Sequence, residues 1–189
     1  MEGAPTVNRT EMVGQTEHVS DIFARIMAKI LTAGFPISPS DEITVAQFQA
    51  LRHIAQHGPC NIGSLAKGLS VSQPAATMLV DRMAKRGLVR RQPGRHDRRQ
   101  AEVSLTQHAE DLIQQIETAR MERLAGILAL MSPDERTQLV ESLERFIAAA
   151  LKLEQAADEI CLRCGTEHQH DCIVNQAHLE LAGTDIERT

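Results

Sequence analysis

Apolar side chains recur at helical spacing in the first part of the chain. They fall at positions i, i+3, i+4, i+7 and i+11, and the set is Val19, Ile22, Phe23, Ile26 and Ile30. A single apolar stripe at this spacing predicts an amphipathic helix that ends near Gly34. Residues 1–15 show no such period and contain Gly, Pro, Thr and Asn, so we expect a flexible arm there. Residues 35–41 include Pro36 and Pro39 and are expected to form a loop.

A second helix is predicted to start after Thr44, whose hydroxyl can cap it. Its predicted packing face comprises Val45, Phe48, Leu51, Arg52 and Ile54. The run His57-Gly58-Pro59 is expected to end it. We interpret this helix as scaffold for the segment that follows.

Two short helices separated by a tight turn are predicted next. The first carries Ile62, Leu65, Ala66 and Leu69 at helical spacing, and the second begins with Ser72 as its cap and Pro74 in its first turn. The buried stripe of the second helix is predicted to be Ala76, Leu79, Val80 and Met83. That stripe leaves a polar and small-residue set on the other faces, namely Gln73, Ala75, Thr77, Met78, Asp81 and Arg82.

Two short runs of β-prone residues follow Gly87, which is expected to end the second short helix. They are Leu88–Arg91 and Ala101–Leu105, and Pro93-Gly94 lies near the start of the connection between them. This order predicts a two-stranded β-hairpin with a long tip.

Two long amphipathic helices are predicted after the hairpin. The first spans about residues 107–131, and Ser132-Pro133 stops it and caps a second one that runs to about Leu153. Their apolar positions include Leu112, Ile113, Ile116, Leu124, Ile127 and Leu128, then Leu139, Val140, Leu143, Ile147, Ala150 and Leu151. A small domain does not need this much apolar surface for its own core, so we expect these helices to form a dimer interface.

The charge of the chain is distributed unevenly. The formal net charge is −5, yet residues 82–99 hold eight Lys or Arg and a single carboxylate, Asp97. A solvated helix surface normally mixes both signs, so this block favours a polyanionic partner. Beside a predicted pair of short helices, it indicates a DNA-binding module.

The same segment resembles the winged helix-turn-helix of the MarR family of bacterial transcription regulators. The match rests on the second short helix followed by RGLVRRQPGRHDRRQAEVSLT, in which Asp97 and Arg98-Arg99 occupy the Asp-x-Arg positions of the family's wing. The resemblance covers roughly residues 16–155. It implies a mainly α fold with a two-stranded β wing and long N- and C-terminal dimerisation helices, and a homodimer that binds a palindromic operator in double-stranded DNA.

We assign candidate DNA contacts on this basis. Wing contacts to phosphate and minor groove are expected from Arg95, Arg98 and Arg99, with Asp97 holding the arginines in place. Base contacts are expected from the recognition helix, through Ser72, Gln73, Thr77 and Arg82. The resemblance also implies repression that is relieved by a small phenolic or aromatic effector.

The last segment, residues 156–189, departs from the family's pattern. Cys161-x-x-Cys164-Gly is followed by His168, His170 and Cys172 within a few residues. Two thiolates at this spacing can bind one metal, and thiolate with imidazole suits zinc, while three thiolates also suit an iron–sulfur cluster. We expect Cys161, Cys164, His170 and Cys172 to be the ligands. A metal or redox sensor, a structural zinc knuckle, a reactive dithiol and a passive tail remain open alternatives.

Composition narrows the function classes. Aromatic residues make up 2% of the chain, with no Trp or Tyr, so the core must be aliphatic and helices are favoured. No membrane span or secretory signal is evident, and we expect a cytoplasmic protein.

Three classes of function are candidates for a chain of this kind: a DNA-binding regulator, an enzyme and a zinc-bearing interaction protein. The sequence shows no Ser/His/Asp arrangement, phosphate-binding Gly-rich loop or His-Glu-x-x-His motif, so no enzyme is expected. Cys60 is interpreted as a small buried thiol in preference to a redox switch.

Overall fold

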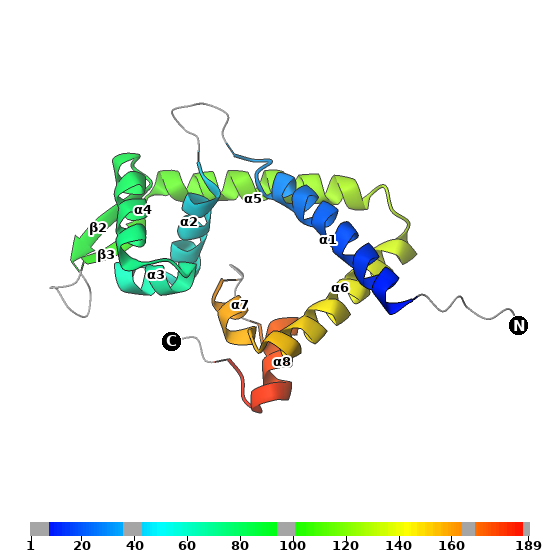
Figure 1. Ribbon diagram of the computed structural model, residues 1–189. Coiled ribbons are helices and arrows are strands. Elements are labelled where there is room, and N and C mark those ends of the chain that lie inside the picture. Colours follow the sequence, from blue (N-terminus) through cyan, green and yellow to red (C-terminus); the bar gives the residue numbers. More distant parts are fainter. Residues whose placement is uncertain (1–7, 36–42, 94–100, 164–168, 187–189) are drawn as a thin grey trace, which may run out of the picture.

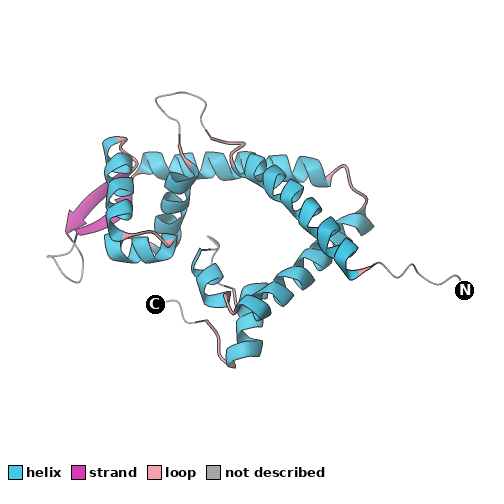
Figure 2. Ribbon diagram, in the orientation of Figure 1, coloured by secondary structure: helices cyan, strands magenta, loops and turns pink. Residues whose placement is uncertain are grey.

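The computed structural model describes residues 8–35, 43–93, 101–163 and 169–186 (Figure 1). Its described part is mainly helical with one small sheet (Figure 2). In chain order the elements are α1 (Arg9–Leu31), α2 (Val45–His57), β1 (Cys60–Asn61), α3 (Ile62–Leu69), α4 (Gln73–Lys85), β2 (Val89–Pro93), β3 (Ala101–Leu105), α5 (Gln107–Leu128), α6 (Pro133–Glu154), α7 (Ala157–Arg163) and α8 (Ile173–Ala182). The predicted fold class, a mainly α winged helix-turn-helix, is confirmed.

Side-chain caps fix the helix starts that the sequence predicted. The Thr44 hydroxyl accepts from the Gln47 backbone N–H at 3.2 Å, and the Gln47 amide oxygen accepts from the Thr44 N–H at 3.0 Å. Ser132 and Glu135 make the same reciprocal pair at the start of α6. Hydrogen bonds from the Ser132 backbone and side chain also lower the pKa of Glu135. Each of these reciprocal pairs is a capping box, and it satisfies backbone N–H groups that the start of a helix would otherwise leave to solvent.

The sheet has three antiparallel strands in the order β1-β3-β2. Along β2 and β3, Val89 lies opposite Leu105 and Pro93 opposite Ala101. The sequence predicted only this hairpin. The third strand, β1, places Cys60 opposite Val103 and Asn61 opposite Glu102, so it joins the start of α3 to the base of the wing.

One largely aliphatic core, which also contains Phe48, joins the sheet, α2, α3, α4 and the first half of α5. Its buried residues are Ile43, Phe48, Ala50, Leu51, Ile54, Leu65, Val80, Met83, Leu88, Val89, Val103, Ala109, Leu112, Ile113 and Ile116. The end of α1 is anchored here as well, because Gly34 approaches the α5 backbone closely. A Cβ on Gly34 would lie 2.7 Å from the Ile116 Cα. We refer to this unit, without α1, as the winged lobe.

The first helix begins earlier than the predicted arm allowed. The arm was expected to extend to residue 15, but α1 starts at Arg9 because the Asn8 side chain caps it, accepting from the Thr10 N–H at 3.3 Å. Residues 1–7 lie outside the described part. The predicted apolar stripe is present on α1 but is mostly uncovered, since Val19, Ile22, Phe23 and Ile26 are 41–63% exposed and Ile30 is buried. Within the described residues, the helices are too short or too polar to cross a membrane.

The described part of the C-terminal segment packs back on the rest of the chain. Leu151 of α6, Ala157 of α7 and Ala177 of α8 form a small buried cluster with Val174 beside it. The Lys152 ammonium lies 2.5 Å from a Glu180 carboxylate oxygen across the α6–α8 contact. Helix α7, at the start of this segment, also contacts α3 of the winged lobe.

Candidate nucleic-acid interface

The paired helices α3 and α4 meet across a turn of three residues, Ser70 to Ser72. Ser70 adopts the left-handed conformation, with φ 51° and ψ 44°, and ends α3. The Val71 N–H donates to the Ala66 carbonyl at 3.0 Å and closes the turn. Ser72 then caps α4 by accepting from the Ala75 N–H at 3.3 Å. The tight turn and the Ser72 cap are therefore present, as the sequence predicted.

One face of α4 is buried and the opposite face is open. Ala76, Val80 and Met83 have no exposed surface. Three of the candidate residues are exposed, namely Ser72, Gln73 and Arg82. A side chain must be exposed to contact a base, and the contact itself stays a prediction. Thr77 is half-buried and its hydroxyl donates to the Gln73 carbonyl at 2.9 Å. Met78 is 56% exposed on the same helix and adds an apolar group that the candidate set left out.

The strands of the wing bring cations beside this helix. Arg90 Nε donates to the Ser104 hydroxyl at 3.1 Å across the β2–β3 pair. Arg91 Nη2 lies 2.6 Å from Asp81 Oδ1 and so joins the wing to α4. Arg86 Nη1 donates to the Gln47 side chain at 3.3 Å and is directed toward α2. The cations counted in the sequence therefore divide between internal contacts and exposed positions such as Arg82 and Lys85.

The tip of the wing, residues 94–100, lies outside the described residues. The four wing candidates Arg95, Asp97, Arg98 and Arg99 belong to it, and their roles stay predictions. The described strands do fix where that tip leaves and re-enters the sheet, at Pro93 and Ala101, which lie opposite each other.

Comparison with known proteins decides the family. A MarR family model matches residues 43–101, which run from the start of α2 to the wing. The HTH-type transcriptional regulator YsmB of Bacillus subtilis is 32% identical over 130 residues, which cover 67% of this chain and 89% of YsmB. The chain belongs to the MarR family.

Other matches agree with this assignment. The HTH-type transcriptional regulator Mb0904 of Mycobacterium bovis is 32% identical over 111 residues, 59% of this chain and 78% of that protein. The crystal structure of RV1404 from Mycobacterium tuberculosis superposes with a TM-score of 0.60 at 28% identity, over 77% of this chain and 96% of that one. The chain is thus a MarR-family, DNA-binding transcriptional regulator and not an enzyme.

Sequence reasoning missed the close packing of a buried histidine behind the interface of this MarR protein. His53 of α2 is buried, and its ring packs so closely on Gly68 of α3 that a Cβ there would lie 2.1 Å from His53 Cε1. The signal available in the sequence was a glycine inside a short helix, which marks a close approach. The contact sets how near α3 lies to α2.

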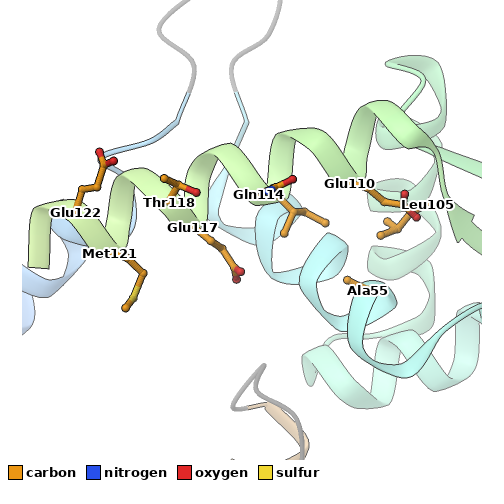
Figure 3. Close-up of a pocket in the computed structure, with 9 residues that line it drawn as sticks. Ala55, Leu105, Glu110, Gln114, Glu117, Thr118, Met121 and Glu122 are labelled. Carbon is orange, nitrogen blue, oxygen red and sulfur yellow. The ribbon is translucent and has the colours of Figure 1, made fainter. Parts of the chain in front are cut away.

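A groove of about 510 Å³ lies between α2 and α5 of the MarR fold. Figure 3 shows Glu117 and Met121 on the side of α5 on which Ala55 of α2 also lies. Three carboxylates line the groove, from Glu110, Glu117 and Glu122, together with apolar side chains. Arg52 Nε lies 3.0 Å from Glu117 and neutralises one of the three.

The tail cysteines have different surroundings. Cys161 on α7 is 2% exposed. Cys172 is half-buried at the start of α8, where its Sγ accepts from the Asn175 N–H at 3.4 Å. His170 Nδ1 lies 3.1 Å from Asp185 Oδ2, and the fully buried Asn175 donates to Asp185 Oδ1 and to the His170 carbonyl. Cys164 and His168 lie outside the described residues, and among those described no group of three or more His, Cys, Asp or Glu could hold a metal.

Cys60 lies in β1 beside the wing and not in a reactive environment. Burial, and after it the nearby charge of Glu102, raises the pKa of the Cys60 thiol to about 11. The thiolate is the reactive form, so this environment disfavours the redox-switch interpretation of Cys60.

We predict that Cys60 in the folded protein reacts with iodoacetamide at pH 8 about a hundredfold more slowly than in the urea-unfolded chain, because so little thiolate is present. Peptide mass spectrometry after timed alkylation measures this position separately from the other cysteines. Glu102→Gln should speed the reaction, since removing a negative charge lowers the pKa. Equal rates in the folded and unfolded chains would contradict the burial of this thiol.

Proposed function

We propose that this MarR protein is a homodimeric repressor that acts in the cytoplasm and binds a palindromic operator in double-stranded DNA. The observation that carries the proposal is the exposed face of α4 beside a wing whose strands hold adjacent arginines. An α-helix of this size enters the major groove, and a β-hairpin beside it reaches the sugar-phosphate backbone.

The helix and the wing are assigned different tasks. Gln73 carries an amide that can make paired hydrogen bonds to adenine, and Arg82 can bind guanine or a phosphate. Ser72, which caps α4, and the half-buried Thr77 are assigned to the edge of the same α4 surface. Arg95, Arg98 and Arg99 are proposed to bind phosphate and the minor groove, with Asp97 holding them, because guanidinium stays charged and binds phosphate with two N–H groups.

The two tasks separate in a binding experiment. Arg98→Ala should weaken binding to every duplex and flatten the slope of log K against log salt by about 0.9, the loss of one phosphate contact. Gln73→Ala should relax the preference at one base pair per half-site, at a cost of about 1–3 kcal/mol. Selection from a random duplex pool followed by fluorescence anisotropy measures both.

Arg145→Ala is the matched control, because this exposed arginine lies on α6, outside the proposed DNA-binding surface, and light scattering of this variant checks that the proposed dimer is intact. An unchanged slope for Arg98→Ala would contradict the wing assignment. A wild-type protein that selects no duplex would contradict the proposed operator binding.

The proposed dimer follows from apolar surface that one protomer leaves uncovered. On α1 this includes Val19 and Phe23, and on α6 it includes Val140, Phe146 and Ile147, all 38–63% exposed. Figure 1 shows α1 and α6 away from the winged lobe, on the side to which the second half of α5 extends. Several exposed apolar side chains on two helices of the fold favour an interface with a second protomer. Two-fold symmetry would then present two copies of α4 to successive major grooves.

Charges introduced at Leu143 and Ile147 should therefore produce monomers that bind the selected operator weakly. The Leu143→Glu, Ile147→Glu variant is to be compared with Val45→Glu, which adds a charge at an exposed apolar position of α2. Light scattering gives the mass and circular dichroism checks the helical fold. A folded double variant that stays dimeric would contradict the proposed interface.

For the regulation of this dimer we propose a metal centre bound by Cys161, Cys164, His170 and Cys172, holding zinc or an iron–sulfur cluster. The supporting observation is the contact between His170 and Asp185. A carboxylate on one ring nitrogen is the usual way in which a metal-binding imidazole is oriented. Because α7 contacts α3 and α8 packs on α6, loss of the centre would act on both the winged lobe and the proposed dimer helix.

A small organic effector is the second candidate, with the cysteines then forming only a structural zinc knuckle. It is favoured by the groove between α2 and α5. Arg52 offsets the charge of Glu117, and the two remaining carboxylates, Glu110 and Glu122, repel an anionic ligand, so an uncharged or cationic organic molecule fits the groove better.

Protein purified without air distinguishes these regulators. Stoichiometric zinc without colour indicates a knuckle, and broad visible absorption lost in air indicates a cluster. If the metal centre is a sensor, chelation or oxidation should release the protein from the selected duplex. If a small organic effector is the regulator, only organic compounds should release it. The triple Cys→Ser variant of Cys161, Cys164 and Cys172 is the control. Absence of metal and sulfide, with unchanged regulation in that variant, would contradict both versions of the centre.

A further inference from the structure

An ion pair joins the recognition helix to the wing. Arg91 Nη2 lies 2.6 Å from Asp81 Oδ1, close enough for a charge-assisted hydrogen bond. Asp81 belongs to the third turn of α4, and Arg91 lies in β2 opposite Val103. The pair thus connects the two parts of the interface through side chains, in addition to the packing of their apolar faces.

The surroundings make Asp81 unusual. Between Ser72 and Pro93 it is the only carboxylate, while the same residues hold five cations: Arg82, Lys85, Arg86, Arg90 and Arg91. A carboxylate on a surface that meets phosphate opposes binding to any duplex. Both side chains of the pair remain accessible to solvent, 48% exposed for Asp81 and 41% for Arg91.

We propose that Asp81 is a specificity-determining positioning residue that acts through Arg91. It holds the guanidinium against α4, where the guanidinium is not available to bind phosphate on arbitrary DNA. It also fixes the angle between the wing and α4, so that both fit the DNA only on the operator. The inference rests on the proposed operator binding by α4 and the wing.

The contribution of the pair to folding is small, because exposed ion pairs typically contribute no more than about 1 kcal/mol. Its effect is expected on the ratio of operator to non-operator binding. Freeing Arg91 adds one phosphate-binding cation, which steepens the salt slope for non-operator DNA by about 0.9.

The test uses the full-length protein, a duplex selected by the wild type from a random pool, and a scrambled duplex of the same length and composition. Asp81→Asn should tighten binding to the scrambled duplex and lower the operator-to-scrambled ratio by about twofold to fivefold, the range that the free energy of an exposed pair allows. Asp81→Glu, which keeps the carboxylate, should retain most of the ratio. Glu141→Gln, which removes a carboxylate from the exposed Glu141–Arg145 pair on α6, should change neither value.

A double-mutant cycle separates the mechanism from simpler ones. If Asp81 acts through Arg91, Asp81→Asn has no further effect on the ratio in the Arg91→Ala background. The same gain in scrambled-duplex affinity in both backgrounds would show a general charge effect and overturn the proposal. A changed preference at a single base pair in both backgrounds would show that Asp81 reads a base, which also overturns it. If the wild type binds its selected duplex while Asp81→Asn, like Glu141→Gln, changes neither the scrambled-duplex affinity nor the ratio, this inference is overturned and the proposed function is left standing. Failure of the wild type to select any duplex would overturn the proposed function first.

Discussion

The fold depends on the division of α5 into a buried half and an exposed half. Ala109, Leu112, Ile113 and Ile116 are buried in the winged lobe, whereas beyond Glu117 the helix is exposed or half-exposed. Burial of a few aliphatic side chains, at roughly 1.5–3 kcal/mol each, is enough to fix the first half in place. The second half has no comparable cover from the residues that the structure describes. A single helix therefore connects the DNA-binding part of this MarR protein to the apolar surface proposed for the dimer.

The connection also explains why α1 and α6 stand where they do. The end of α1 is held on α5 by the close approach of Gly34 to Ile116, and α6 follows α5 after the Ser132 cap. Apart from Ile30 and the end of α1, the described apolar side chains of the α1 stripe are not buried against the winged lobe, and those of α6 such as Val140 and Ile147 are exposed. Their surface is thus left for association, and the same association would set the distance between two copies of α4.

Much of this arrangement could be predicted because its signals are local. Helical periodicity, the Thr44 and Ser132 caps, and the serine before Pro74 each act within one or two turns of chain. The start of α1 was wrong because the Asn8 cap lies in a segment without apolar period. Strand β1 was missed because two residues cannot show an alternating pattern, and its pairing with β3 is a contact between distant parts of the chain.

The candidate site divides in the same way. The exposure of Gln73 and Arg82 followed from the buried stripe on α4. The internal bond of Thr77, the burial of His53 and the pairing of Asp81 with Arg91 depend on tertiary geometry, which no spacing rule contains. The folding of α7 and α8 onto α6 is likewise a packing result, since a Cys/His-rich composition indicates chemistry and not a docking surface.

The short strand β1 has a mechanical consequence. It pairs with β3 and leads directly into α3, while β2, on the other edge of β3, is joined to α4 by Arg91 and Asp81. The helix pair and the base of the wing are therefore connected at both edges of the sheet. A tilt of α5 would turn the helix pair and the base of the wing together as one rigid body, and the spacing between α4 and the wing would be preserved.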